Sequence, residues 1–482
     1  MQAPARDTLS LRDTFSQGKP LWSRAIAKPA VEFGPVELPV LMGQIPDELR
    51  GSLYRNGAGR LQRSGQFVDH WFDGDGSILG VHFTDAGATG IYRYVQTQGF
   101  QAEESADQYL YAGYGQLPPG PLWKRWGTKL KNAANTSVLA LPDKLLALWE
   151  GGNPHALDLE TLETQGLDNL GILEPKQPYS AHPKQDPQTG DLFNFGVVSG
   201  AKSYIQLYRS NASGQIQQQS QIPIPRISLV HDFVLAGPYL IFLVPPLALS
   251  VVPALLSIQS FSEALRWQPQ HGTQIIVIDR HTLKEISRIE TDPWFQWHFG
   301  NGYQAADGTL TIDYVRYNNF DTNQWLKEFV TGSPTTQVSA KLSRLQIDIN
   351  AGKVLSNDPL SDLECEFPTV APHNVGQHHD SLFFCHKSPP KNDEYFNSIG
   401  RLDLNSGQID QAIFAAGCYP AEPIYVPSSK GSDWILTVVF DGHKDQSTVQ
   451  ILQADNLAAG PICILELPEI IPFGFHGTWK SR

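Results

Sequence analysis

The sequence has little cysteine and no excess of positive charge. It contains four cysteines, which form no Cys-x-x-Cys pair, and no secretory signal stands at the N-terminus. We therefore expect free thiols in a reducing compartment and a cytoplasmic location. The formal net charge is −13. Because binding to phosphate backbones needs a basic face, this balance argues against nucleic acid as a partner.

The chain also lacks the features that divide a long protein into modules. No Ser/Gly linker, low-complexity run or charge block interrupts its 482 residues, although that length alone suggests roughly three domains. Apolar residues make up 41%, and glycine (41) and proline (35) are plentiful, as in proteins built from many short strands and turns. We predict an N-terminal arm at residues 1–40, Pro-rich and lying on the surface, followed by a single all-β domain at residues 41–482.

Strands followed by tight turns are abundant along the chain. Three turns begin with Asp and have Gly as their fifth residue, at 186–190, 348–352 and 403–407. The Asp side chain can cap such a turn, and the Gly can adopt the left-handed conformation. Hairpins that recur about every 50 residues are typical of propeller blades, and an array of β-sandwiches is the alternative. The expected strands include 90–97, 137–141, 145–149, 192–198 and 204–208.

The run Asp73-Gly74-Asp75-Gly76 lies between apolar segments. Since glycine supplies the positive φ of a tight turn, we expect a hairpin here. A calcium loop is the alternative, but the acidic residues that such a loop needs further along are missing.

Two segments break the strand pattern. Residues 117–131 mix prolines, Trp123 and Trp126 with lysine and arginine, and residues 233–262 carry no charge. Prolines interrupt the uncharged segment, so we expect a strand at 239–244 and then a short helix lying in a membrane interface rather than a membrane-spanning helix. Apolar patches near 117–131 and 245–265 would then contact a membrane surface. The alternative is that both segments simply cover the core.

Four of the fourteen histidines stand in apolar, strand-like or Gly/Pro-bounded positions, far apart in the sequence. Imidazole is the commonest side-chain ligand for a metal. A metal site made from such dispersed residues must be assembled by the fold, and a propeller brings its inner strands together on one axis. For each histidine the alternative is a buried ring satisfied by one hydrogen bond. The four are His182, His231, His298 and His476.

Three glutamates occupy equally apolar positions, beside Trp, Phe or Pro. A carboxylate in such a place is rarely buried without a partner, and a metal-ligating histidine needs an acceptor for its second ring nitrogen. Four histidines and three glutamates therefore make chemical sense as one set. The alternative for each glutamate is an ordinary surface or salt-bridged residue. The three are Glu150, Glu366 and Glu422.

Several motifs together resemble the carotenoid cleavage oxygenase family, which includes apocarotenoid oxygenases, stilbene-cleaving enzymes and the animal retinoid isomerase. The resemblance runs from about Gly43 to Trp479, and within the family the chain looks most like the cyanobacterial apocarotenoid oxygenases. The motifs occur in family order: Gly51–Gly57, Phe72–Gly76, Ser180–Pro183, Val230–Phe233, Glu366–Pro368, Glu422-Pro423 and Gly474–Gly477.

The resemblance implies a seven-bladed β-propeller with an axial metal site and a small helical or loop cap over one face. It implies Fe(II) held by the four histidines, with an apolar tunnel leading to the metal from the membrane-facing patch. It also implies that Glu150, Glu366 and Glu422 accept hydrogen bonds from His231, His298 and His476, respectively.

The implied activity is that of an Fe(II)-dependent dioxygenase. Such an enzyme splits a conjugated C=C bond of an apocarotenal or apocarotenol with O2 and releases aldehydes such as retinal-type compounds. A stilbene-cleaving dioxygenase of the same family, which needs a Tyr and a Lys to engage a phenol, is one alternative. A non-catalytic lipid-binding propeller is another.

Overall fold

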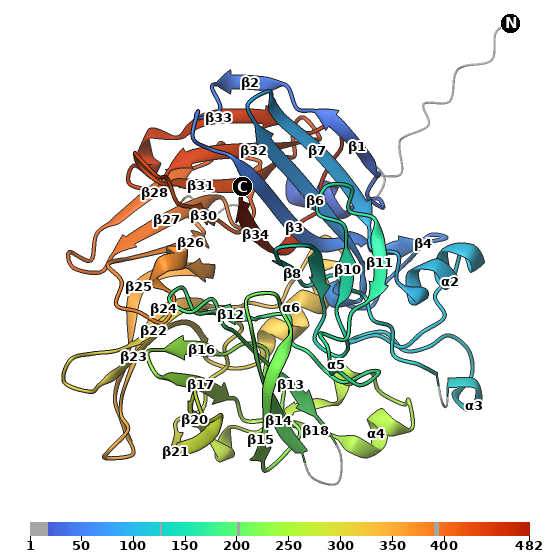
Figure 1. Ribbon diagram of the computed structural model, residues 1–482. Helices are drawn as coiled ribbons and strands as arrows, with labels where there is room; N and C mark the ends of the chain where they lie inside the picture. The colour runs from blue at the N-terminus through green and yellow to red at the C-terminus, as the bar shows by residue number, and fades with distance from the viewer. Residues whose placement is uncertain (1–17, 126–127, 200–202, 390–394) are drawn as a thin grey trace, which may run out of the picture.

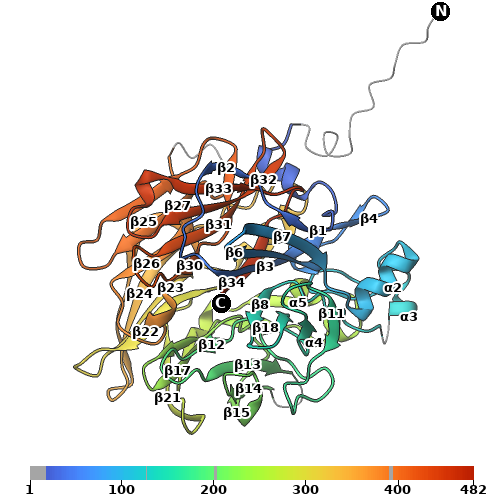
Figure 2. The same cartoon turned by 45° about the horizontal axis from the view of Figure 1, so that its top comes forward.

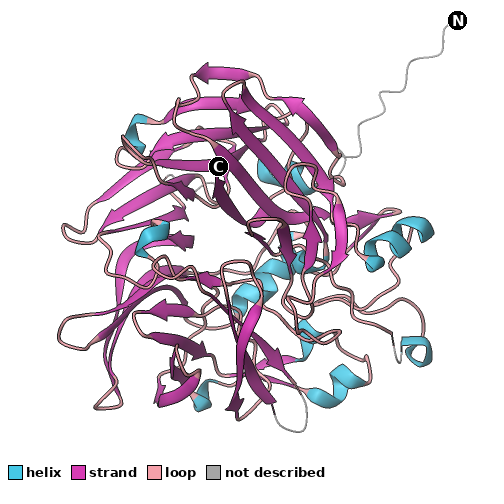
Figure 3. Ribbon diagram, viewed as in Figure 1, coloured by secondary structure: helices cyan, strands magenta, loops and turns pink. Residues whose placement is uncertain are grey.

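A computed structural model describes residues 18–125, 128–199, 203–389 and 395–482. Strands dominate it and the helices are few and short (Figure 3), which confirms a mostly-β fold. The strands expected from the sequence are present as β7 (Gly87–Tyr94), β8 (Ser137–Ala140), β9 (Leu145–Leu148), β13 (Leu192–Val198) and β14 (Ser203–Ser210).

The strands form five larger sheets and two two-stranded ones. The larger sheets are arranged around the middle of the molecule (Figures 1 and 2). Within the described part of the chain, none of them closes on itself. The strands of the first sheet, in spatial order, are β1 (Phe33–Glu37), β7, β6 (Asp75–Thr84), β3 (Gly51–Arg60) and β34 (Gly474–Ser481). The second sheet contains β11 (Thr164–Leu167), β10 (His155–Leu157), β9 and β8. The third contains β12 (Lys184–Gln185), β13, β14 and β15 (Ile216–Ile224).

The fourth sheet is the largest, with 11 strands, and one parallel pair, β16 with β22, joins its two parts. Its strands in spatial order are β21 (Lys284–Thr291), β20 (Thr273–Asp279), β17 (Tyr239–Val244), β16 (Val234–Ala236), β22 (Phe299–Gln304), β23 (Leu310–Tyr317), β24 (Ala340–Asp348), β25 (Lys353–Thr369), β26 (Ser381–His386), β27 (Ser398–Asp403) and β28 (Ile409–Ile413).

The fifth sheet and the two small sheets complete the set. The fifth contains β2 (Val40–Gly43), β33 (Pro461–Glu466), β32 (Gln446–Gln453), β31 (Trp434–Asp441) and β29 (Cys418–Pro420), with β30 (Ile424–Val426) also paired to β31. The small sheets pair β4 (Gln62–Arg63) with β5 (Gln66–Phe67) and β18 (Leu247–Leu249) with β19 (Leu265–Trp267).

The helices connect strands and cover the sheets. Helix α6 crosses behind the middle of the molecule in Figure 1, whereas α2, α3 and α4 lie at its periphery. The α-helices are α2 (Gln98–Ala106), α3 (Leu122–Arg125), α4 (Val251–Leu255), α5 (Phe261–Ala264) and α6 (Asp321–Phe329), and the 3-10 helices are η1 (Leu21–Ile26), η2 (Trp71–Asp73), η3 (Pro269–His271), η4 (Pro372–Asn374) and η5 (Leu457–Ala459).

The last strand of the chain completes the first sheet. β34 pairs antiparallel with β3, and Arg55 lies opposite Gly477 in this register. A C-terminal segment is usually poorly ordered unless it is tied down, and this pairing ties it down. It carries the C-terminal segment toward the middle of the molecule, where the C-terminus is seen in Figure 2.

The three Asp-to-Gly turns have the structure that their sequences predict. Gly190, Gly352 and Gly407 have φ of 76°, 62° and 72°, in the left-handed region that glycine adopts without strain. In one of them, the Asp186 carboxylate accepts a hydrogen bond from the backbone N–H of Gln188 at 3.1 Å. Each turn joins two neighbouring strands, so local sequence sets these hairpins.

The prediction of a hairpin at residues 73–76 is wrong. The segment is the end of η2 followed directly by β6, and neither glycine in it has positive φ. Its carboxylates are held by distant groups: Asp73 accepts from the backbone N–H of Gly115 at 3.0 Å, and Asp75 is ion-paired with Arg63 at 2.8 Å. A Cβ at position 76 would collide with backbone carbonyl oxygens of the neighbouring segment. Close packing, and not a turn, therefore requires Gly76.

The described part of the N-terminal arm packs against the sheets. Residues 1–17 lie outside the described residues. In η1 the side chain of Trp22 is fully buried and stacks on Phe329, with ring centroids 4.7 Å apart, so this short helix belongs to the core and not to the surface. β1 and β2, in contrast, are largely exposed edge strands that pair with β7 and β33. The domain boundary at residue 41 stays a prediction.

The two unusual segments form an exposed apolar region. The strand expected at 239–244 is β17, and a short helix, α4, follows it. Trp123 is 78% exposed and Val252 66%, whereas Trp126 lies outside the described residues. A cavity of about 720 Å³ is lined by both segments, including Leu117, Leu130 and Val251. Of the helices that the structure describes, none has the length and apolar character needed to span a membrane.

Candidate metal centre

Four inner strands bring the four histidines together. His182 lies two residues before β12, His231 three before β16 and His298 directly before β22, while His476 is within β34. One ring nitrogen from each can be chosen so that all four nitrogens lie within 4.8 Å of one another. The structure therefore gathers residues that are far apart in the sequence into one cluster that could hold a metal ion.

The histidine rings are buried and crowd one another. Their side chains are at most 13% exposed, and Nε2 of His182 lies 2.9 Å from Nε2 of His231. Burial, followed by the neighbouring rings, lowers the pKa of both His182 and His231 well below the usual value. These two rings are therefore neutral, which is the form that binds a metal.

One ring nitrogen in the cluster has no partner. Nε2 of His298 is buried and makes no hydrogen bond to any described residue. Buried polar groups are nearly always satisfied, and each of the four imidazoles can present one unprotonated ring nitrogen to the cluster. A metal cation would satisfy them all at once, so the residues present fit a bound transition metal.

A carboxylate and an arginine fix the orientation of His476. Nδ1 of His476 lies 2.8 Å from Oε1 of Glu422, whose Oε2 accepts from the backbone N–H of Gly477 at 2.8 Å. Arg55 lies beside this carboxylate and also donates to the carbonyl oxygen of Phe475 at 3.2 Å. Burial raises the pKa of Glu422, but His476 and Arg55 outweigh it and the net shift is downward. The ionised carboxylate can therefore hold the Nδ1 proton of His476 and turn Nε2 toward the cluster.

The same arrangement recurs at His298. Its Nδ1 lies 2.6 Å from Oε2 of Glu366, and the hydroxyl of Tyr317 donates to Oε1 of the same carboxylate at 2.7 Å. Burial raises the pKa of Glu366, but His298 and Tyr317 outweigh it and the net shift is downward. Both oxygens of Glu366 are thus occupied, and the unpartnered Nε2 of His298 faces the cluster.

The third glutamate makes a looser contact. Oε1 of Glu150 lies 3.3 Å from Nδ1 of His231 and 3.8 Å from Nε2 of His182. Burial raises the pKa of Glu150 well above the usual value, with the nearby Asp232 adding to the shift. The structure therefore places each glutamate beside the histidine that the family resemblance assigned to it, at two short distances and one longer one.

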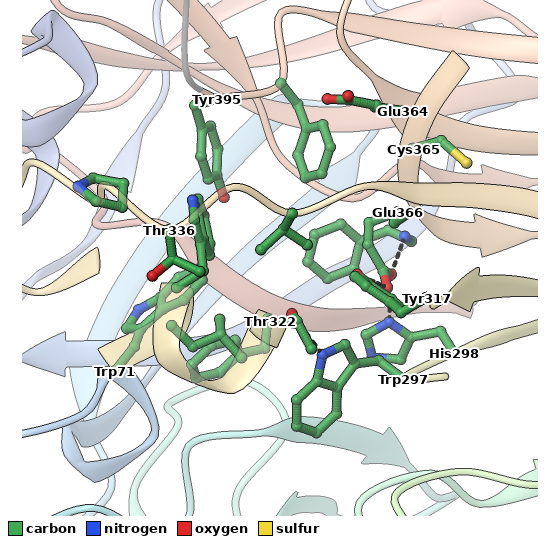
Figure 4. A pocket seen from close by; sticks show the side chains of 18 of the residues that line it. Trp71, Trp297, His298, Tyr317, Thr322, Thr336, Glu364, Cys365, Glu366 and Tyr395 are labelled. Atoms are coloured by element: carbon green, nitrogen blue, oxygen red, sulfur yellow. Dashed lines mark hydrogen bonds and ion pairs between the residues drawn. The ribbon is translucent and has the colours of Figure 1, made fainter. Parts of the chain in front are cut away.

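A largely aromatic cavity opens beside the cluster. Its volume is about 310 Å³, within the range of small-molecule sites. Figure 4 shows Trp71, Trp297 and Tyr317 among its lining side chains, with His298 and Glu366 at one side. Thr322 accepts a hydrogen bond from the indole N–H of Trp297 at 3.1 Å. The cavity can therefore hold an apolar conjugated molecule next to a metal bound by the histidines.

Sequence reasoning missed several residues around the site. Arg55 lies within the Gly51–Gly57 motif, so a signal for it was present, although its partner Glu422 is 367 residues away. Tyr317 and Tyr395 are ordinary tyrosines in the sequence, and neither stands in a motif. Only the fold brings them to the cavity wall.

Comparisons with known proteins agree with this geometry. The chain is 33% identical over 453 residues to apocarotenoid-15,15'-oxygenase of Synechocystis sp., covering 91% of this chain and 92% of that protein. It is 27% identical over 489 residues to isoeugenol monooxygenase of Pseudomonas putida, covering 97% and 99%. The solved structure of cobalt-substituted Synechocystis apocarotenoid oxygenase matches with a TM-score of 0.86 at 29% identity, over 98% of this chain and 99% of that one.

A family profile matches almost the whole chain. The profile is described as that of the retinal pigment epithelial membrane protein, and it matches residues 26–481. A solved chimera of apocarotenoid oxygenase and that protein aligns with a TM-score of 0.87 at 29% identity, over 96% of this chain and 98% of the chimera. The matched range contains the positions of all four histidines and all three glutamates. The chain therefore belongs to the retinal pigment epithelial membrane protein family, the family of the carotenoid cleavage oxygenases.

Proposed function

We propose that this chain is an Fe(II)-dependent dioxygenase that cleaves a conjugated C=C bond of an apocarotenoid. One molecule of O2 is consumed, the C=C bond breaks, and each former alkene carbon leaves as an aldehyde carrying one oxygen atom. The observation that carries the proposal is the convergence of four buried imidazoles, one with an unpartnered Nε2, beside an aromatic cavity. The similarity to an apocarotenoid oxygenase supports the choice of substrate.

The donor set supports a divalent first-row metal. His182, His231, His298 and His476 would hold it through imidazole nitrogens, which suit iron, copper, nickel and zinc. Four neutral ligands leave the charge of the ion uncompensated, so the ferrous state is favoured over the ferric one. When bound, iron(II) supplies the redox chemistry that a reaction with ground-state O2 requires. A cobalt-substituted relative has been crystallised, which supports a site for this class of metal.

The side chains that line the cavity would bind and orient the substrate. Trp71, Trp297 and Phe367 line the wall and would hold a flat polyene by stacking, with one double bond next to the metal. The reaction needs no proton transfer from a side chain.

The strand groups support a seven-bladed propeller. The 11-stranded sheet divides into three runs, first at the parallel pair between β16 and β22 and then along β25, which pairs with β24 through its first part and with β26 through its end. Together with the other four large sheets, these runs make seven groups around the histidines. We propose that residues 41–482 form this single domain and that α6 is part of a cap over one face.

The exposed apolar region supports contact with a membrane. We propose that Trp123, Leu130 and Val252 enter the surface of a lipid bilayer from the cytoplasmic side. The polyene would then pass from the bilayer into the cavity of about 720 Å³ between the segments near 117–131 and 245–265. Leu130 is 54% exposed and Trp123 is 78% exposed. Contact of such large apolar side chains with water is unfavourable unless another surface covers them.

Two other functions fit less well. Isoeugenol monooxygenases and a resveratrol cleavage oxygenase are also relatives, at 25% to 27% identity, so a phenolic alkene is the second candidate. A propeller that only binds lipid has no need for four imidazoles converging on one point.

The test is product identification. Iron-loaded protein is incubated in air with a panel of apocarotenals, apocarotenols, hydroxystilbenes and isoeugenol, and products are identified by mass spectrometry with 18O2. We expect two aldehydes from an apocarotenoid, each carrying labelled oxygen. Iron-loaded protein that cleaves only the phenolic alkenes, or nothing in the panel, would overturn the proposal.

A further inference from the structure

The cavity beside the histidines is lined by Tyr395, a buried residue whose hydroxyl is accessible to the cavity. Tyr395 is 4% exposed, and its hydroxyl makes no hydrogen bond to any residue that the structure describes. In Figure 4 it lines the cavity on the side away from His298, with its hydroxyl directed toward the other lining side chains. Burial raises its pKa above the usual value, so the hydroxyl is neutral and available as a donor.

The ring of Tyr395 is held rigidly. It packs against Phe473, with ring centroids 4.4 Å apart, and against Phe329 and Trp22 at 5.8 and 5.9 Å. The orientation of the hydroxyl axis is therefore fixed before any ligand arrives, and little conformational entropy is lost when it makes a hydrogen bond. Most other hydroxyls of the lining are already engaged: Tyr317 donates to Glu366, and Thr336 donates to Glu328 at 2.8 Å.

A charged pair lies in the same lining. Nζ of Lys387 and Oε2 of Glu364 are 3.4 Å apart, with side chains 23% and 27% exposed. Gln337, which is exposed, lines the cavity too. The lining therefore combines the histidines and aromatic rings with a paired cation and carboxylate and with the Tyr395 hydroxyl. A pure hydrocarbon would leave the Tyr395 hydroxyl without a partner.

We propose that Tyr395 is a specificity-determining residue that donates a hydrogen bond to the oxygen at one end of the substrate. The ligand class is an elongated conjugated molecule with a terminal carbonyl or hydroxyl oxygen, and we commit to the apocarotenal. The inference rests on the proposed function and adds to it the direction in which the substrate lies: the oxygenated end points to Tyr395 and the hydrocarbon end points away.

The competing explanation is that water satisfies the Tyr395 hydroxyl. In that case the hydroxyl contributes nothing to the choice of ligand, and its removal changes the affinity for all ligands alike. Tyr395→Phe separates the two explanations, since it removes one oxygen atom and leaves the packing of the ring on Phe473 intact. Tyr314→Phe is the matched control, because that buried hydroxyl donates to Asn357 at 2.9 Å and does not line the cavity.

The experiment measures binding without turnover. The full-length, iron-loaded protein is titrated under argon with an apocarotenal, with the same polyene ending in methyl in place of the aldehyde, and with a hydroxystilbene. Quenching of tryptophan fluorescence reports binding, because Trp71, Trp297 and Trp325 line the cavity. In the wild type we expect the aldehyde to bind about fivefold more tightly than the hydrocarbon, the ratio that one hydrogen bond gives.

The Tyr395→Phe protein should bring that ratio close to one by weakening only aldehyde binding, while Tyr314→Phe leaves it unchanged. An unchanged ratio in Tyr395→Phe, an equal loss for both polyenes, or no binding of either polyene would overturn the inference. Tighter binding of the hydroxystilbene that also depends on Tyr395 would support recognition of an oxygen but contradict the apocarotenal. Discrimination by Tyr395 in a protein that cleaves no polyene in air would contradict the proposed function and leave the inference standing.

Discussion

Arg55 of β3 lies 3.3 Å from the carboxylate of Glu422, the residue that holds His476. The same guanidinium donates to the carbonyl oxygens of Glu422 and Phe475, at 3.0 and 3.2 Å. One buried arginine therefore contacts both the carboxylate that orients the histidine and the strand that carries it. The first sheet and the C-terminal histidine are joined at this point.

Replacing Arg55 by Met should destabilise the protein strongly. The side chain of Arg55 is 4% exposed and that of Glu422 13%, so the substitution leaves a buried carboxylate without its cation. We expect the free energy of unfolding to fall by about 3–5 kcal/mol and iron content to fall with it. Chemical denaturation and metal analysis measure the two effects.

Arg50→Met is the control for this substitution. Arg50 pairs at 2.8 Å with Asp85, whose side chain is 86% exposed, so its loss should cost less than about 1 kcal/mol. Equal losses of the free energy of unfolding in the two variants would show that the contact between Arg55 and Glu422 does not contribute more than an exposed ion pair.

Glu366→Gln should weaken metal binding. The amide cannot accept the Nδ1 proton of His298 as strongly as the carboxylate does, and losing such a partner typically lowers metal affinity about 10- to 100-fold. Tyr317→Phe, which removes only the hydroxyl that donates to Glu366 at 2.7 Å, should lower it by a smaller factor, about fivefold. Competition with a chelator measures both affinities. A loss of metal affinity in Tyr317→Phe as large as the loss in Glu366→Gln would contradict this order.

Stability at low pH should depend on Asp313. Burial raises the pKa of this carboxyl, but hydrogen bonds from Arg344 and His379 outweigh burial, so its pKa lies below the ordinary value of 3.8. A carboxyl with a lowered pKa stabilises the fold above its unfolded-state pKa, and that contribution is lost as the pH falls through the folded-state pKa. The stability difference between wild type and Asp313→Asn should therefore be largest near neutral pH and shrink below about pH 4.

Urea denaturation at a series of pH values tests this dependence. The control is Asp362→Asn, because the side chain of Asp362 is 95% exposed where it pairs with Lys341, and exposed pairs contribute little. A difference between wild type and Asp313→Asn that does not change with pH would contradict the assignment.

Binding to lipid vesicles should depend on the exposed apolar region. Trp123→Glu and Val252→Glu place charges on side chains that are 78% and 66% exposed, so folding should be unaffected while insertion into a bilayer becomes unfavourable. We expect sedimentation with neutral phospholipid vesicles for the wild type and its loss in both variants. Ile413→Glu, at a side chain that is 58% exposed on β28, away from helices α3 and α4, should still sediment.

The sequence predicted the parts of this structure that local patterns encode. The Asp-to-Gly turns need only a capping side chain and a glycine, and each is present within five residues. The four histidines were found because their neighbours are apolar or are Gly and Pro. In contrast, the strand order around the centre depends on pairings such as β3 with β34, between residues more than 400 positions apart.

The predictions that were wrong also failed because of contacts between residues far apart in the sequence. Gly74 and Gly76 indicated a turn, but the acidic residues beside them find partners at Gly115 and Arg63, and those partners draw the segment into a strand. Trp22 lies in a Pro-rich stretch that suggests a surface arm, yet it stacks on Phe329. In both cases long-range packing overrides the local signal.

The iron content of purified protein tests the central claim most directly. Wild-type protein loaded with ferrous iron and then freed of excess by gel filtration should retain about one iron per chain, and His298→Ala, which removes the unpartnered Nε2, should retain almost none. His378→Ala, at a side chain that is 66% exposed, should match the wild type. Equal iron in His298→Ala and wild type would show that these four histidines do not share one metal.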